Sequence, residues 1–70
     1  MTDTADLLPR DLEIANLAAA GVSTRVIAER LFITTNTVKY HLRRVYEALG
    51  IHNRAQLANS LRDRENYPNG

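Results

Sequence analysis

The feature that most constrains the fold is a run of apolar residues at helical spacing between positions 35 and 49. At about 100° per residue, one face of this stretch collects Val38, Leu42, Val45, Tyr46 and Leu49. The opposite face is polar and mainly cationic, with Asn36, Lys39, Tyr40, Arg43, Arg44 and Glu47. Thr34 is a favourable N-cap, and Gly50 suits the left-handed residue that ends a helix. The stretch therefore predicts an amphipathic helix over 35–49.

A shorter amphipathic segment precedes this helix. Ser23 is a suitable N-cap, and Ile27, Ala28 and Leu31 share one face of a helix predicted over 24–31. A tight turn, Phe32-Ile33-Thr34, leads directly into the long helix. Two helices joined in this way are the helix-turn-helix pattern, whose second helix enters the major groove of DNA. Because a cationic face alone is more often solvated surface, the helix pair and not the charge favours DNA binding.

Two further helices complete an all-α fold. One is predicted over about 8–20, with Pro9 in its first turn, Asp11 and Glu13 near the positive end of its dipole, and Gly21 after it. The other is predicted over 53–62, where Asn53 and Gln56 form a capping-box-like pair. No segment alternates as a strand would. We therefore expect one four-helix domain over 7–62, with flexible ends at 1–6 and 63–70.

The positive charge is concentrated on the predicted helix-turn-helix. The net charge is only +1, but acidic residues dominate positions 1–20, and most cations lie between 21 and 55: Arg25, Arg30, Lys39, Arg43, Arg44 and Arg54. This is the region where a phosphate backbone would need them.

Other functions lack the necessary residues. Without Cys, and with His41 and His52 far apart in the chain, the sequence holds no recognisable metal site, and we expect no cofactor. No carboxylate pairs with a histidine at a catalytic spacing, and so small a domain encloses little volume for a substrate, so we do not expect an enzyme. No apolar run approaches membrane-spanning length. We expect a cytoplasmic protein on the nucleoid, without membrane contact or a small-molecule substrate.

Several segments together resemble the LuxR-type (GerE-like) DNA-binding domain of bacterial transcription regulators. Leu7-Leu8-Pro9-Arg10-Asp11 is similar to the family's opening Leu-Thr-Pro-Arg-Glu segment. Thr37-Val38-Lys39-Tyr40-His41 is similar to its recognition helix, and Leu49-Gly50-Ile51-His52-Asn53-Arg54 to its closing corner. Leu8 stands where the family prefers Ser or Thr as N-cap, a loss that Asp6 would offset by capping the helix one turn earlier.

The resemblance implies sequence-specific binding of double-stranded DNA, with the third helix in the major groove. By position, it implies base contacts by Lys39, Tyr40 and Arg43. It implies contacts to the DNA backbone by Thr24, Thr35, Thr37, Asn53 and Arg54. The polar face of the third helix adds Asn36 and Arg44 to the predicted backbone contacts.

The residues leave some of these roles open. Arg43 can bond guanine bidentately, whereas Lys39 suits either a guanine or a phosphate. Tyr40 would contact a thymine methyl or a phosphate, or pack against the second helix. It is bulkier than the family's usual Val or Thr, so base preference does not transfer from relatives. His41, at the edge of the apolar face, is expected to be a packed structural residue, with a phosphate contact as the alternative.

The fourth helix supports two hypotheses. The resemblance implies a two-fold homodimer through it, and Leu57, Ala58 and Leu61 offer an apolar stripe for this contact, although the same residues would equally complete the core. The alternative function is a small protein-interaction module that pairs with a larger regulator or with RNA polymerase through this helix. A stand-alone regulator and one domain of a longer regulator would look the same here.

Overall fold

A computed structural model describes residues 7–65, and within them the chain forms four helices and no strands. The helices are α1 (Pro9–Ala19), α2 (Thr24–Leu31), α3 (Thr35–Leu49) and α4 (Arg54–Glu65). This confirms the predicted all-α fold and the predicted bounds of α2 and α3. Helix α4 continues to Glu65 rather than ending at 62. The predicted flexible end at 1–6, the Asp6 cap and the tail beyond Glu65 lie outside the described residues.

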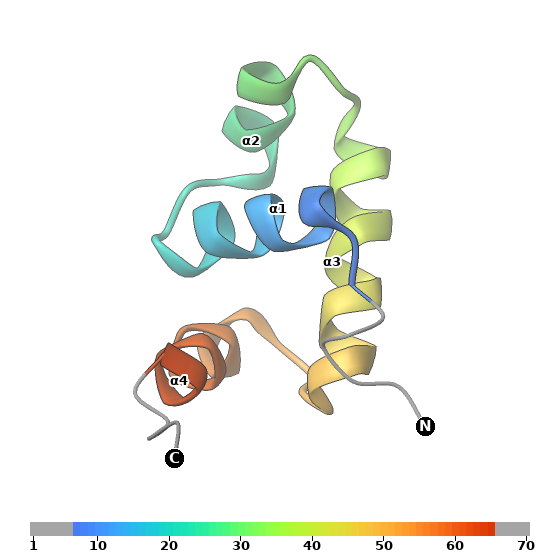
Figure 1. Ribbon diagram of the computed structural model, residues 1–70. Coiled ribbons are helices and arrows are strands. Elements are labelled where there is room, and N and C mark those ends of the chain that lie inside the picture. The colour runs from blue at the N-terminus through green and yellow to red at the C-terminus, as the bar shows by residue number, and fades with distance from the viewer. Residues whose placement is uncertain (1–6, 66–70) are drawn as a thin grey trace.

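Helix α1 lies at the centre of the domain. It crosses α3 on one side and faces α4 on the other, while α2 packs on α3 and α1 (Figure 1). Apolar side chains from all four helices meet there and are buried: Ile14, Ala15, Ala18, Ile27, Ala28, Val38, Leu42, Val45 and Leu57. The core therefore holds α3 by its apolar face and leaves its polar face outward.

Side-chain caps begin three of the helices. Ser23 Oγ accepts from Val26 N–H at 3.2 Å, and Thr34 Oγ1 accepts from Thr37 N–H at 3.1 Å. At α4, Asn53 Oδ1 accepts from Gln56 N–H at 3.1 Å, which confirms the predicted cap. These bonds satisfy N–H groups that have no acceptor within the helix.

Helix α1 begins differently, because Leu8 occupies the N-cap position and its side chain has no acceptor. Asp11 stabilises the first turn instead, because its Oδ2 accepts from Leu8 N–H at 2.8 Å. This is half of a capping box, in which the third helical residue bonds back to the residue before the helix.

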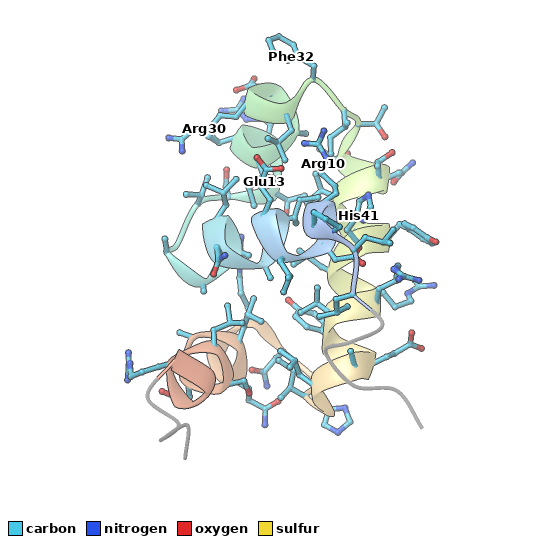
Figure 2. The ribbon with its side chains drawn as sticks, viewed as in Figure 1. Arg10, Glu13, Arg30, Phe32 and His41 are labelled. Carbon is cyan, nitrogen blue, oxygen red and sulfur yellow. The ribbon has the colours of Figure 1, made fainter. Side chains whose placement is uncertain are left out.

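Phe32 ends α2 in a left-handed backbone conformation, which is unfavourable in free energy for residues that have a Cβ. Its φ is 58° and ψ 44°, the residue is 92% exposed, and its ring points away from the domain (Figure 2).

The left-handed conformation of Phe32 costs roughly 1–2 kcal/mol in a residue with a Cβ, whereas glycine loses about 0.5–1 kcal/mol in chain entropy. Phe32→Gly should therefore raise the free energy of unfolding in urea by about 0.5–1 kcal/mol. Phe32→Ala, which keeps the Cβ, is the control, and an equal gain there would refute the backbone explanation.

Candidate nucleic-acid interface

The predicted base-contact residues lie on the exposed side of α3. Lys39, Tyr40 and Arg43 are all solvent-exposed, and Tyr40 retains 58% of its accessible surface. More than half of the Tyr40 surface is therefore open to solvent. These three residues are called the exposed face of α3 below. They share this face because α3 buries Val38, Leu42 and Val45 on its other side.

A surface depression of about 300 Å³ adjoins this exposed face. Lys39 and Arg43 line it together with the nearly buried Leu42 and the half-buried Tyr46. Leu42 and Arg43 lie three and four residues after Lys39, and Tyr46 follows them by four and three, so the four residues form one strip along the helix. The strip combines two cationic groups with an apolar floor, which suits contact with both phosphates and the apolar parts of bases.

The predicted backbone-contact residues with hydroxyl or amide groups lie at helix N-termini. Thr35 and Asn36 are exposed in the first turn of α3, and Thr24 is half-buried at the start of α2. Thr37 is half-buried, and its Oγ1 lies 2.9 Å from Thr34 Oγ1. Helix N-termini carry partial positive charge and N–H donors, which is the environment that a phosphate prefers.

Arg44, a predicted backbone contact, is half-buried and bonds to α1. Its Nε donates to Asp11 Oδ2 at 3.0 Å, while His41 Nδ1 lies 2.6 Å from Asp11 Oδ1. Asp11 is completely buried, and His41 lies on α3 beside the start of α1 (Figure 2). We call these three residues the Asp11 cluster. His41 is thus the packed, structural histidine that its position on the helix predicted.

Hydrogen bonds keep the Asp11 carboxyl ionised. Burial raises the pKa of the Asp11 carboxyl, but hydrogen bonds from His41, the Leu8 N–H and Arg44 outweigh it and hold the pKa below its ordinary value. The hydrogen bond and charge of Asp11 in turn raise the pKa of the Arg44 guanidinium. Asp11 is therefore an anion at neutral pH although it has no solvent contact.

From the sequence, Asp11 was expected only to favour the positive end of the α1 dipole. Its partners on α3 lie 30 and 33 positions further along the chain, so no local pattern could identify them. The one available signal was that Asp11 falls on the same side of α1 as Ile14 and Ala18, which are buried.

The corner before α4 also bonds within the domain. Arg54 is half-buried, and its Nη2 donates to the carbonyl oxygen of Val22, which ties α4 to the turn between α1 and α2. Asn53 is exposed while it caps α4, and Gln56 Oε1 accepts from His52 N–H at 2.7 Å. Arg54 therefore has a structural role here, whether or not it also contacts DNA.

The apolar stripe of α4 belongs largely to the core. Leu57 has no exposed surface, and Leu61 is half-buried against the core cluster. Ala58 is half-buried as well. Leu57 thus completes the core, which was one of its two predicted roles, and in this fold only Ala58 and Leu61 retain surface for a second copy of the chain.

Residues 7–65 lack two further features, a metal-binding cluster and a membrane-spanning helix. No group of three His, Asp or Glu side chains there is placed to hold a metal ion. In the same residues, no helix has both the length and the apolar character needed to cross a bilayer.

The arrangement of a short α2, a tight turn and a long α3 with an exposed cationic face agrees with comparison to known protein families. Residues 5–61 match the family model described as bacterial regulatory proteins, luxR family. The chain belongs to the luxR family. The matched residues 5–61 are a helix-turn-helix domain that binds DNA in transcription regulation.

The regulators that this chain is similar to are much longer than the chain. The Probable transcriptional regulatory protein NarL of Mycobacterium tuberculosis is 41% identical over 59 residues, which are 83% of this chain and 27% of that protein. The CsgBAC operon transcriptional regulatory protein of Escherichia coli is 39% identical over 62 residues, 89% of this chain and 29% of that protein. A Mycobacterium bovis protein named as an HTH-type transcriptional regulator is 41% identical over 51 residues, 73% of this chain and 6% of its own length.

Proposed function

We propose that this luxR-family domain binds duplex DNA sequence-specifically, with α3 in the major groove. The observation that carries this proposal is the exposed face of α3, where Lys39, Tyr40 and Arg43 all extend into solvent from a helix whose other side is held in the core. A helix held this way presents its side chains to base edges in a fixed register.

Each residue of the exposed face suits a particular contact. Arg43 would donate two hydrogen bonds to guanine O6 and N7. Lys39, four residues earlier on the same face, would reach a neighbouring guanine or a phosphate. Tyr40, whose ring meets the His41 ring edge-on with centroids 5.4 Å apart, would pack on a thymine methyl or bond a phosphate through its hydroxyl.

The DNA backbone would be held mainly by helix N-termini. Thr24 at α2, Thr35, Asn36 and Thr37 at α3, and Asn53 at α4 supply hydroxyls, amides and nearby backbone N–H groups. Arg54 would add a phosphate contact through guanidinium N–H groups other than the buried Nε and the one that bonds Val22. These contacts set the register of the domain on DNA and carry no base information themselves.

We further propose that the domain acts as a homodimer on repeated half-sites, with Ala58 and Leu61 of α4 in the contact. It would act on chromosomal DNA in the cytoplasm, by binding and not by catalysis. Because the chain spans less than a third of the NarL and CsgBAC regulators, activation, repression and contact with RNA polymerase are questions for the whole protein.

Leu61→Glu is expected to lower dimer affinity, because a carboxylate at a half-buried apolar position cannot be desolvated cheaply in the contact. Analytical ultracentrifugation in the presence of a duplex carrying two half-sites measures the change. Asn59→Glu, which adds the same charge at an exposed position of α4, is the control. Unchanged assembly in a folded Leu61→Glu variant would contradict a dimer through this stripe.

The proposed function is tested by selecting duplexes from a random library at about 0.15 M salt and comparing the winners with scrambled DNA over a salt series. We expect an enriched repeat, a clear preference for it, and binding that weakens as salt rises on both DNAs. A folded protein that enriches no sequence and shows no salt-dependent binding would refute the proposal. That outcome would favour the alternative, a protein-interaction module that acts through α4.

A further inference from the structure

We propose that Asp11 withholds Arg44 from the DNA backbone and thereby limits how tightly the domain binds non-specific DNA. The inference rests on the proposed function, because it concerns the same face of α3. It assigns to a buried carboxylate on α1 a role in setting how many cations of α3 reach phosphates.

The polar side of α3 is divided into two parts. Lys39, Tyr40 and Arg43 are exposed, whereas His41 and Arg44 are joined to α1 through Asp11. Arg44 follows Arg43 directly, so its Cα lies beside the exposed face of α3. Its guanidinium nevertheless points across to α1, and the side chain is only 32% exposed.

Both carboxylate oxygens of Asp11 form hydrogen bonds with groups of this domain. Oδ2 accepts from Leu8 N–H at 2.8 Å and from Arg44 Nε at 3.0 Å, and Oδ1 lies 2.6 Å from His41 Nδ1. Asp11 has no exposed surface while Arg44 is in place, so a guanidinium that swings out gives up its bond to a buried carboxylate. A phosphate at the surface, screened by salt and water, offers Arg44 less than this buried carboxylate does.

Withholding one arginine lowers the electrostatic part of DNA binding. Non-specific binding is electrostatic and grows with the number of cations that reach phosphates. Specific binding depends in addition on base contacts by Lys39, Tyr40 and Arg43, which the Asp11 cluster leaves exposed. Holding Arg44 at Asp11 therefore limits affinity for non-specific DNA and leaves the base contacts of the exposed face of α3 in place.

The test measures affinity for a scrambled duplex over a salt series with four variants. Arg44→Gln removes the withheld charge, and Arg43→Gln removes the neighbouring exposed charge as a matched control. Asp11→Asn releases Arg44, and Asp11→Asn with Arg44→Gln removes it again. Circular dichroism shows that each variant is folded, and Arg44→Gln carries the test if Asp11→Asn does not fold.

We expect Arg44→Gln to leave the salt dependence unchanged and Arg43→Gln to make it shallower. Asp11→Asn should make the slope steeper by about 0.9, an extra change in affinity of about 3.5-fold between 50 and 200 mM salt. The double variant should return the slope to that of the unmodified protein.

Three results would overturn the inference: a slope in Arg44→Gln that falls as it does in Arg43→Gln, an unchanged slope in folded Asp11→Asn, or a steeper slope that persists in the double variant. Because the comparison uses scrambled DNA, a protein without sequence preference would refute the proposed function and leave this comparison intact. Absence of any DNA binding would refute both.

Discussion

Replacing Lys39 and Arg43 together by alanine is expected to lower affinity for the selected duplex by about 100-fold without unfolding the domain. Both side chains are exposed on α3 and contribute nothing to the core. Each well-formed contact to a base edge is worth roughly 1–3 kcal/mol, so losing two corresponds to about two orders of magnitude. Binding titrations on the selected and the scrambled duplex measure the effect, and the preference between them should nearly disappear.

The matched control removes two exposed arginines from α2, Arg25 and Arg30. This variant carries the same net charge as the Lys39 and Arg43 variant but leaves the exposed face of α3 intact. It is expected to weaken binding to both duplexes alike and to keep the preference between them. If both double variants lost the preference equally, or neither did, the assignment of base contacts to α3 would be wrong.

The second large effect concerns stability. Asp11→Asn should lower the free energy of unfolding at pH 7 by about 2–3 kcal/mol, because the amide removes the buried anion that accepts from Leu8, His41 and Arg44. The NH₂ group of the introduced asparagine would also face N–H donors, to which it cannot form a hydrogen bond. Native domains of this size are stable by only roughly 3.5–10 kcal/mol, so the loss is large but leaves a folded protein. Urea unfolding followed by circular dichroism measures it.

Asp11 also sets an acid dependence whose sign follows from its environment. The pKa of Asp11 in the folded protein lies below the ordinary 3.8, so the unfolded chain binds the proton more readily. The stability that Asp11 contributes is therefore complete above about pH 5 and is lost as the pH falls through the folded-state pKa. The Asp11→Asn variant should lose less stability than the unmodified protein on acidification from neutral pH.

Glu13→Gln is the control for both stability measurements. Glu13 lies on the same helix and pairs with Arg10 at 3.3 Å, but both side chains are about half exposed. Such surface pairs contribute roughly 0–1 kcal/mol, so this variant should change little at neutral pH. Equal losses in Asp11→Asn and Glu13→Gln would contradict the importance of the buried cluster.

The sequence determined the parts of this protein that depend on local spacing. Apolar residues three and four apart located α2 and α3, and Ser23, Thr34 and Asn53 marked helix starts through bonds to residues three positions on. The same periodicity placed Lys39 and Arg43 opposite the core, so the helix-turn-helix and its candidate base contacts could be predicted. Their actual contacts with DNA remain predictions.

Only the tertiary structure decided what the buried polar groups and α4 do. The bonds of Asp11 to His41 and Arg44, and of Arg54 to the Val22 carbonyl, join residues 30 to 33 positions apart. Leu57 is buried because α4 folds back onto α1, which its own apolar pattern could not distinguish from a dimer surface. The physical reason is that the cost of burying a charge, or the gain from burying a leucine, depends on which helix lies opposite, and spacing along one helix contains no such information.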